Sequence, residues 1–218
     1  MKMRTNMNEH YDISSIREVT KSFTTEKRFS HILGVEKEAC ELGKIFLPEK
    51  CEKLRVAGIL HDITKNFSYE KQLELCNEYG IELEKHTAPK LLHAKTGCEF
   101  ARRTFGGNIV DDEIYSAIYY HTTGKAQMTL FEAIIYLADY IEETRTFGDC
   151  IELRKYFYEN INNADSYEDK LEILRQTLIL SFDMTIRNLL DEGKIVDFYT
   201  MSARNYLIVN EKNLKWRK

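Results

Sequence analysis

The spacing of apolar residues is the feature that most constrains this fold. Apolar side chains recur at steps of three and four residues along nearly the whole chain, which is the period of an amphipathic helix. Only two prolines and ten glycines interrupt 218 residues, and no convincing set of alternating strands is seen. The pattern therefore predicts an all-α fold. The predicted helices cover about 12–24, 26–46, 49–62, 68–79, 90–105, 110–121, 129–143, 149–160, 167–192 and 200–209.

Local signals support several of these helix ends. Ser68 is placed as an N-cap, and Gly80, Gly106 and Gly193 stand where helices should stop. No linker or low-complexity segment interrupts the pattern. We therefore expect residues 1–218 to form a single all-α domain, a helical bundle with its core at about 13–145 and a C-terminal helical extension at about 149–209.

Composition excludes several classes of function. The 31 basic and 35 acidic residues give a formal charge of −4, which argues against a general nucleic-acid binder, since phosphate backbones recruit basic surfaces. No apolar run is long enough to span a bilayer, so we expect a cytoplasmic protein without a membrane partner. The five cysteines are widely spaced with no C-x-x-C pair, which favours reduced thiols over a structural zinc site.

Several polar side chains interrupt faces that the pattern predicts to be buried. His31 in "RFSHILGV", His93 in "PKLLHAKTG" and His121 in "AIYYHTTGK" each lie on an apolar face. A lone histidine in such a place is more often a hydrogen-bonded core residue than a ligand. Asp139 in "IIYLADYIEETR" is harder to explain, because a carboxylate among apolar neighbours must be paired or metal-bound to tolerate burial.

The stretch "VAGILHDITK" places His61 and Asp62 side by side at the end of an apolar helix. Adjacent helical residues differ by about 100° in direction, so both reach one cleft only if the helix end points into it. With these two, six polar intrusions fall on five predicted helices, which a shared polar centre explains better than independent accidents. Imidazole and carboxylate are ligands for zinc, iron and manganese, and six ligands suggest two metal ions with Asp62 as the candidate bridge.

The order of these residues resembles the H…HD…D signature of the HD-domain metal-dependent phosphohydrolases. The surrounding words "RFSHILGV", "AGILHDITK", "LLHAKTG", "AIYYHTTG", "LADYIEETR" and "TMSARNYLI" are similar to those of the YqeK family, bacterial HD-domain enzymes assigned as symmetrical bis(5'-nucleosyl)-tetraphosphatases. The resemblance covers roughly residues 13–209, nearly the whole chain.

The resemblance implies a ligand set, a metal and a substrate. It implies that one ion is held by His31, His61, Asp62 and Asp139, and that Asp62 bridges to a second ion held by His93 and His121. The implied metal is iron, with manganese or another divalent ion able to substitute, whereas the residues alone do not choose among them. The implied substrate is diadenosine tetraphosphate, which a metal-bridged hydroxide would split into two ADP molecules. From the residues alone, only phosphoester or phosphoanhydride hydrolysis follows.

Residues near these ligands are candidates for substrate binding. Lys65, three residues after Asp62, is predicted to act on a phosphate or the nucleophile, or else to be a solvated lysine at a helix end. Arg28, three residues before His31, is expected to pair with phosphate or with Glu132 or another acid. Arg145 and Glu142 both follow Asp139 closely. Like Arg28, Arg145 is expected to pair either with phosphate or with an acidic side chain. Three further candidates directly follow His121, namely Thr122, Thr123 and Gly124. They either offer hydroxyl and backbone groups to phosphate oxygens or simply end the helix.

Other residues are interpreted as structural or are left open. His86 is expected in an exposed loop, and His10 near the N-terminus is left out of the cluster. Three tyrosines are predicted either to pack helices or to stack a base, namely Tyr119, Tyr120 and Tyr136. Arg204 and Asn205 in "TMSARNYL" either reach the site or tie the terminal helix to the core, and we expect the second.

Three hypotheses for function remain. The chain is a dinucleoside-tetraphosphate hydrolase, an HD phosphohydrolase of another nucleotide (a nucleoside triphosphate, a cyclic nucleotide or guanosine tetraphosphate), or a metal-stabilised nucleotide-binding module without catalysis. Intact residues at all six ligand positions, together with Lys65, speak against the third. Pocket shape separates the first two and is invisible in sequence, as are oligomeric state and base preference.

Overall fold

The structure, a computed structural model, describes residues 11–83, 87–210 and 216. Within them the chain forms helices and turns without a strand, which confirms the all-α prediction. The α-helices are Ile13–Ser22 (α1), Glu26–Phe46 (α2), Cys51–Leu60 (α3), Tyr69–Tyr79 (α4), Leu92–Phe105 (α5), Asp112–Tyr120 (α6), Leu130–Ile141 (α7), Gly148–Ile161 (α8), Tyr167–Asp191 (α9) and Phe198–Val209 (α10). Short 3₁₀ helices, Pro48–Lys50 (η1) and Pro89–Leu91 (η2), precede α3 and α5.

The helix ends follow local capping chemistry. The hydroxyl of Ser68 accepts a hydrogen bond from the backbone N–H of Lys71, as its predicted N-cap role requires. Gly80 ends α4 in the left-handed conformation, with φ at +65°, where a side chain would be strained. The end of α3 differs from the prediction: the helix stops at Leu60, not at 62. After Leu60 the backbone N–H groups donate to carbonyls three residues earlier, as Lys65 N–H does to the carbonyl of Asp62. Tight turns therefore replace the α-helix here.

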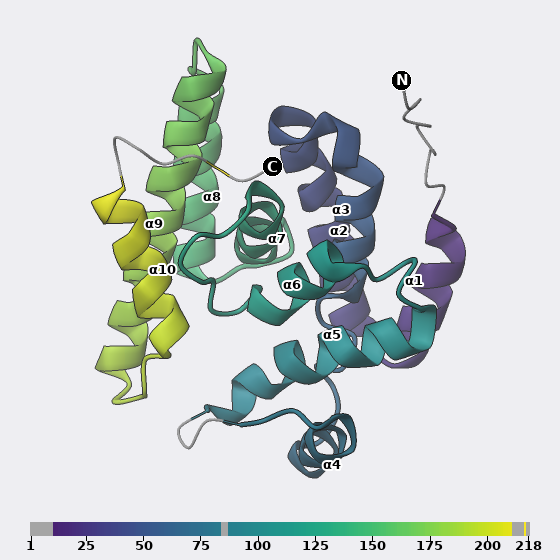
Figure 1. The fold of residues 1–218 in the computed structure, drawn as a ribbon. Coiled ribbons are helices and arrows are strands. Elements are labelled where there is room, and N and C mark those ends of the chain that lie inside the picture. The colour runs from purple at the N-terminus through teal and green to yellow at the C-terminus, as the bar shows by residue number, and fades with distance from the viewer. Residues whose placement is uncertain (1–10, 84–86, 211–215, 217–218) are drawn as a thin grey trace, which may run out of the picture.

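Helix α7 lies in the middle of the molecule (Figure 1). All residues from Leu130 to Ala138 are buried, so this helix is enclosed on every side and not along one stripe only. It packs against α2, α3 and α6 on one side and against α8 and α9 on the other. The most enclosed helix therefore carries Asp139 at its C-terminal end, which fixes the position of that carboxylate.

Helices α2 and α3 share the most extensive helix–helix contact among the described residues. Gly58 on α3 allows this approach, because a Cβ atom at that position would lie 3.0 Å from Cα of Glu36 on α2. Glu36 is itself buried, and its carboxylate accepts hydrogen bonds from Arg17 of α1 and Arg55 of α3 at 2.7 and 2.9 Å. The packing brings His31 on α2 and His61 after α3 to the same place.

Helices α8, α9 and α10 lie together on one side of α7 (Figure 1). Their buried apolar residues, including Leu153, Leu178 and Phe182, belong to the same hydrophobic cluster as those of α2, α3 and α7. Arg204 of α10 contacts the carboxylate of Asp183 on α9, which ties the last helix to the bundle as predicted. The division into a core and a C-terminal extension stays a prediction.

Two further expectations concern membranes and cysteines. Among the described residues, no helix is both long enough and apolar enough to cross a membrane. All five cysteines are free thiols. Cys76, Cys98 and Cys150 are buried, whereas Cys40 and Cys51 are partly exposed.

Candidate metal centre

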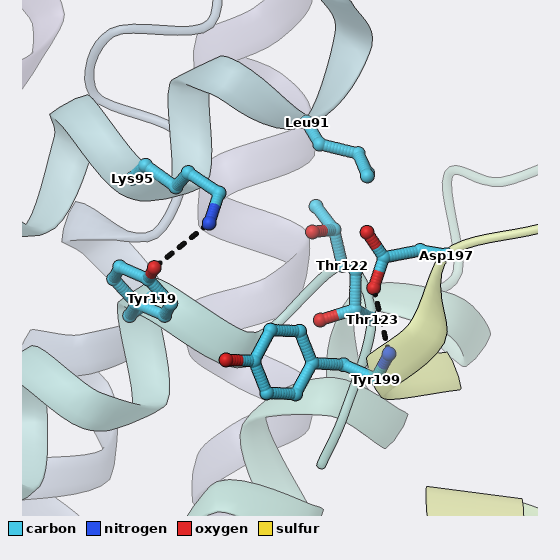
Figure 2. Close-up of a pocket in the computed structure, with 7 residues that line it drawn as sticks. All are labelled: Leu91, Lys95, Tyr119, Thr122, Thr123, Asp197 and Tyr199. Carbon is cyan, nitrogen blue, oxygen red and sulfur yellow. Dashed lines mark hydrogen bonds between the residues drawn. The ribbon is translucent and has the colours of Figure 1, made fainter. Parts of the chain in front are cut away.

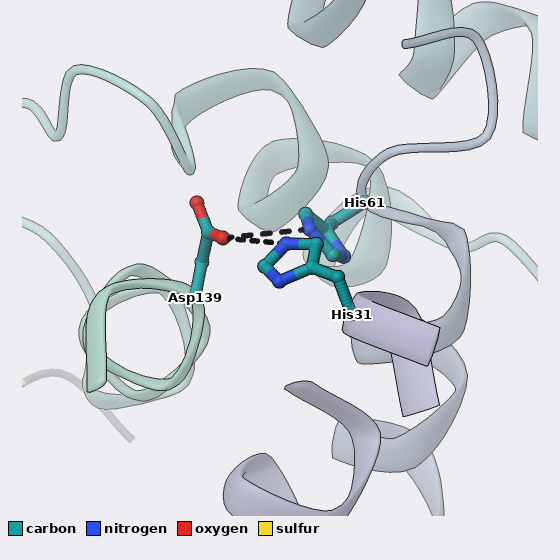
Figure 3. Close-up of side chains that lie close together, drawn as sticks. All are labelled: His31, His61 and Asp139. Atoms are coloured by element: carbon teal, nitrogen blue, oxygen red, sulfur yellow. Dashed lines mark ion pairs between the residues drawn. The ribbon is translucent and has the colours of Figure 1, made fainter. Parts of the chain in front are cut away.

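The six predicted ligands converge at one point although they come from five segments of the chain. His31 lies on α2, His93 on α5 and Asp139 on α7, whereas His61 and His121 are the residues that directly follow α3 and α6. Figure 3 shows His31, His61 and Asp139 pointing toward one another from three separate elements. Most of the six candidate ligands therefore lie at helix ends or in the turns that follow helices, and not in the middle of helices.

The tight turns after α3 explain how neighbouring residues face the same centre. The ring Nδ1 of His61 bonds to the carbonyl of Gly58 at 2.7 Å, which leaves Nε2 facing inward. His121, after α6, repeats the arrangement: its Nδ1 bonds to the carbonyl of Ile118 at 2.6 Å. A backbone carbonyl on Nδ1 fixes the tautomer whose Nε2 lone pair is available to a ligand.

The carboxylate of Asp62 lies between two pairs of histidines. Its Oδ1 is 3.1 Å from Nε2 of His93 and 3.5 Å from Nε2 of His121. Its Oδ2 is 3.4 Å from Nε2 of His61 and 3.7 Å from Nε2 of His31. One oxygen thus faces each pair.

Asp139 completes the first group. Its Oδ1 lies 3.0 Å from Nε2 of His31 and 3.7 Å from Nε2 of His61. Across the centre, Nε2 of His93 and Nε2 of His121 are 3.1 Å apart. Metal–nitrogen and metal–oxygen bonds of about 2.1 Å at angles near 90–110° place donor atoms roughly 3.0–3.4 Å apart. The separations of 3.0 and 3.1 Å therefore fit ligands that surround cations, and that of 3.7 Å is slightly wider.

Buried atoms without hydrogen bonds support the same interpretation. Among the described residues, Nε2 of His31, Nε2 of His61 and Oδ1 of Asp62 are buried yet form no hydrogen bond of acceptable geometry. Buried polar atoms are normally paired, so three such atoms in one cluster need an explanation. They are two imidazole nitrogens and a carboxylate oxygen, which is a donor set that divalent transition metals prefer.

The local electrostatics favour the ligand forms of four groups, His61, His93, Asp62 and Asp139. Burial lowers the pKa of His61, and it lowers the pKa of His93 to about 4, so both rings are neutral near pH 7. Burial alone would raise the pKa of Asp139, but the guanidinium of Arg145 and the contact with His31 hold it well below its usual range. The pKa of Asp62 is also far below its usual value, since the surrounding imidazoles outweigh burial. Neutral imidazole and ionised carboxylate are the forms that bind metals. His31 differs: burial lowers its pKa, but hydrogen bonds to Asp139 and Glu142 outweigh burial and raise the pKa to about 9, so this ring must release a proton before it binds a metal.

Glu142 supports His31 from behind, a role that the sequence did not reveal. Its fully buried carboxylate lies 3.0 Å from Nδ1 of His31 and also accepts from the backbone N–H and hydroxyl of Thr144, both at 2.6 Å. Gly34, one helical turn after His31, leaves the space for it, because a Cβ atom there would lie 2.2 Å from Oε2 of Glu142. The signals in the sequence were the closeness of Glu142 to Asp139 and a glycine, Gly34, in the interior of α2.

A buried polar network holds the turn that follows Asp62. The hydroxyl of Thr64 donates to the backbone carbonyl of His93 at 3.0 Å and contacts the hydroxyl of Thr96, also at 3.0 Å. Gln72 of α4 donates to the backbone carbonyl of Thr64 at 2.7 Å. These bonds fix the turn against α5, and sequence analysis missed them because neutral polar residues carry no distinctive pattern.

The predicted phosphate-binding cations lie around this centre. Arg28 contacts Oδ2 of Asp62 at 2.7 Å, not Glu132, and Arg145 contacts Oδ1 of Asp139. In both arginines the buried Nε has no hydrogen-bond partner among the described residues. Lys65 lies 3.2 Å from both ring nitrogens of His93, and burial lowers its pKa against the opposing charges of Asp62 and Asp139.

The three residues after His121 were expected either to bind phosphate or to end the helix, and the structure shows different environments for them. Thr122 is partly exposed, whereas Thr123, labelled beside it in Figure 2, is buried and donates to the carbonyl of Gly124 at 2.9 Å. Gly124 adopts φ of +63° and packs so closely that a Cβ atom would lie 2.7 Å from the ring of Phe182, so the turn and the packing both require glycine. Contact of these residues with substrate stays a prediction.

The remaining histidines and tyrosines are distributed as follows. His10 and His86 lie outside the described residues. Tyr136 is buried, and its ring centroid is 4.7 Å from that of Phe182, so it packs helices. Tyr119 and Tyr120 are partly exposed, and their rings contact each other with centroids 4.7 Å apart.

The sequence comparison bears directly on this centre. Residues 28–144 match the HD domain, and this segment contains all six predicted ligands. The chain belongs to the HD-domain family. The resemblance predicted from the motifs is thereby confirmed, and hydrolases with this domain bind divalent metals.

Two curated relatives of this HD-domain protein carry the same name. A protein of Bacillus subtilis (strain 168) named "Bis(5'-nucleosyl)-tetraphosphatase, symmetrical" is 38% identical over 142 residues, which cover 64% of this chain and 74% of that protein. A protein of the same name from Staphylococcus aureus (strain NCTC 8325 / PS 47) is 31% identical over 208 residues, which cover 94% of this chain and 98% of that protein.

A solved structure shares most of the architecture. It is a crystal structure from Clostridium acetobutylicum, described as a predicted HD superfamily hydrolase involved in NAD metabolism. The two chains are 37% identical with a TM-score of 0.79, over 92% of this chain and 98% of that one. The helices after the HD domain are therefore shared with that relative, since the similarity extends well beyond residue 144.

Proposed function

We propose that this HD-domain protein hydrolyses diadenosine tetraphosphate symmetrically to two ADP molecules, using two divalent metal ions. The observation that carries the proposal is the position of Asp62, with one carboxylate oxygen toward His93 and His121 and the other toward His31 and His61. A carboxylate in this position suits a bridge between two ions, as two-metal phosphohydrolysis requires. The names of the two curated relatives support the choice of substrate.

Each ion has a set of ligands in this proposal. His31, His61, Asp62 and Asp139 hold the first ion, and Asp62, His93 and His121 hold the second. We expect iron, with manganese or another divalent ion able to replace it, because histidine and carboxylate ligands accept several first-row metals. Bound ions would supply a water molecule of lowered pKa and neutralise charge on the phosphate oxygens.

The chain's own cations bind and orient the substrate. Arg28 and Arg145 each hold a ligand carboxylate with one nitrogen and keep an unpaired Nε, so each has donors left for phosphate oxygens. The Nζ of Lys65 is equally distant from both ring nitrogens of His93. It therefore points along neither nitrogen lone pair and is poorly aligned for a hydrogen bond to that ring. Its ammonium is therefore placed to interact with a phosphoryl oxygen, which gains charge during phosphoryl transfer.

Product analysis tests this proposal. Diadenosine tetraphosphate is incubated with protein loaded with Fe²⁺ or Mn²⁺ under anaerobic conditions, and products are separated by ion-exchange chromatography. ADP as the sole product is the expected result, and exhaustive chelation should remove the activity. AMP together with ATP would contradict symmetric cleavage, and full activity without metal would contradict the two-metal site.

A nucleotide panel in the same assay addresses the other hypotheses. Nucleoside triphosphates, cyclic nucleotides and guanosine tetraphosphate are each incubated with the metal-loaded protein. If one of these disappears while diadenosine tetraphosphate does not, the protein is an HD phosphohydrolase of another nucleotide. If none is hydrolysed but ADP binds, the nucleotide-binding module is favoured instead.

A further inference from the structure

Arg154 of α8 donates hydrogen bonds to three backbone carbonyls, at the end of α7 and in the connection that follows it. Its Nε donates to the carbonyl of Ile141, and its Nη2 donates to the carbonyl of Glu142 and, at 2.9 Å, to that of Arg145. The last carbonyls of a helix have no partner within the helix, so a guanidinium in this position caps α7. The bond to Arg145 lies beyond the helix and is more than capping requires.

The connection between α7 and α8, residues 142–147, carries two side chains of the candidate metal centre. Glu142 supports His31 from behind, and Arg145 contacts the carboxylate of Asp139. Four residues of the connection, at positions 143, 144, 146 and 147, are exposed to solvent. Packing therefore restrains this segment on one side only, and hydrogen bonds to its backbone contribute much of what holds Arg145 in place.

The helix that presents Arg154 is itself fixed in position. Helix α8 lies beside α7, and its Leu153 and Phe157 are fully buried in the core (Figure 1). Tyr158, one helical turn after Arg154, donates a hydrogen bond to Oε1 of Glu38 on α2 at 2.5 Å. Because α8 is anchored to both α7 and α2, its guanidinium is a fixed point against which the connection can be held.

We propose that Arg154 is a positioning residue for the substrate site. By holding the backbone carbonyl of Arg145, it keeps the Arg145 guanidinium beside Asp139, with the buried and unpaired Nε of Arg145 left for a phosphate oxygen. The inference rests on the proposed function, in which Arg145 binds phosphate. Both arginines lie outside residues 28–144, the segment that matches the HD domain, so α8 adds to the site from beyond that domain.

A cap that serves stability alone is the competing interpretation, and the two make different predictions. A stability cap lowers the free energy of unfolding when it is removed but leaves the folded site as it was. A positioning residue acts through Arg145, so its loss weakens phosphate binding only while Arg145 is present. The effects of the two substitutions are then non-additive, and a double-mutant cycle measures this.

Binding of pyrophosphate, measured by calorimetry, tests the proposal. Mn²⁺ is supplied at a concentration that saturates every variant, so that changes in metal affinity through Glu142 do not enter. Arg145→Met should weaken pyrophosphate binding about tenfold, as loss of one charge-assisted hydrogen bond does. Arg154→Gln should cause a similar loss in wild type but little further loss in the Arg145→Met background. Lys155→Gln is the matched control on α8, since that exposed side chain pairs only loosely with Glu159, at 3.8 Å, and should leave binding unchanged.

Two outcomes would overturn the proposal. If Arg154→Gln weakens binding equally in both backgrounds, it acts through another residue, and if it lowers only the stability toward urea, it is a cap. Should Arg154→Gln fail to fold, Arg154→Lys replaces it in the cycle, because an ammonium keeps the charge but lacks the planar fork that reaches three carbonyls. The same coupling to Arg145 is then expected. Failure of the wild type to cleave diadenosine tetraphosphate would refute the proposed function separately, since these binding measurements do not depend on turnover.

Discussion

Nδ1 of His31 lies 3.0 Å from Oε1 of Glu142, and this carboxylate is completely buried. Glu142 is not one of the six candidate ligands, but it accepts from His31, whose Nδ1 does not bond to a backbone carbonyl as those of His61 and His121 do. A carboxylate behind a ligating histidine fixes the ring and increases its basicity. The affinity of the first metal position therefore depends on a residue that does not reach the metal.

We predict that Glu142→Gln weakens metal binding by about 10- to 100-fold, because outer partners of ligating histidines typically contribute this much. Competition with a chelating dye measures the affinity. Glu143→Gln is the matched control, since that neighbouring carboxylate is exposed and pairs with Lys37 at the surface. Equal affinities in wild type and Glu142→Gln would show that His31 needs no such support.

A second prediction concerns the glycine that gives Glu142 its space. Alanine in a helix interior is usually better than glycine by about 1 kcal/mol, but a Cβ atom at Gly34 would lie 2.2 Å from Oε2 of Glu142. We expect Gly34→Ala to lower both thermal stability and metal affinity. Gly148→Ala is the control, because nothing lies within 4 Å of a Cβ atom there.

The same clash predicts a non-additive double variant. In a Glu142→Ala background the carboxylate is gone, so Gly34→Ala should no longer destabilise, and urea unfolding of the four proteins measures this coupling. If Gly34→Ala is equally harmful in both backgrounds, the clash is with something other than Glu142.

Sequence analysis predicted the fold closely because local helix signals agree with the tertiary structure. The apolar period predicted a helix at about 26–46, and α2 has the same bounds in the structure. The six candidate ligands stood out since charged or ionisable groups on apolar faces are rare. Glu142, Thr64 and Gln72 did not stand out, because their importance comes from residues that only folding brings near them.

Asp62 is the residue on which both proposed metal positions depend. Asp62→Asn keeps the shape of the side chain but removes its charge and one oxygen ligand, so we expect loss of both ions and of turnover. Metal analysis after dialysis, alongside the product assay, measures the two effects. Asp112→Asn, which alters a fully exposed carboxylate on α6, should retain both. Loss of only one ion would contradict a bridging role.

Lys65 is predicted to act on the substrate and not on the metals. Lys65→Met keeps the apolar stem and removes the ammonium, so we expect kcat to fall by roughly 10²–10³, as when an oxyanion-stabilising donor is lost, with unchanged metal content. Lys71→Met, which removes an exposed lysine paired with Glu74, should leave kcat unchanged. If Lys65→Met loses metal in proportion to activity, the lysine instead holds His93 in place.

The last prediction concerns the pH dependence of the metal-free protein. Burial lowers the pKa of His31, but contacts with Asp139 and Glu142 outweigh it and raise the pKa to about 9. A histidine with a raised pKa stabilises the fold fully below its unfolded value, about 6.5, and loses that contribution as pH rises through its folded value. We therefore expect unfolding free energy, measured with urea and a chelator, to fall by about 1–3 kcal/mol between pH 6.5 and 9. His31→Gln lacks the titrating group, so its stability should be flatter over that range, and parallel curves for the two proteins would assign the decline to other residues.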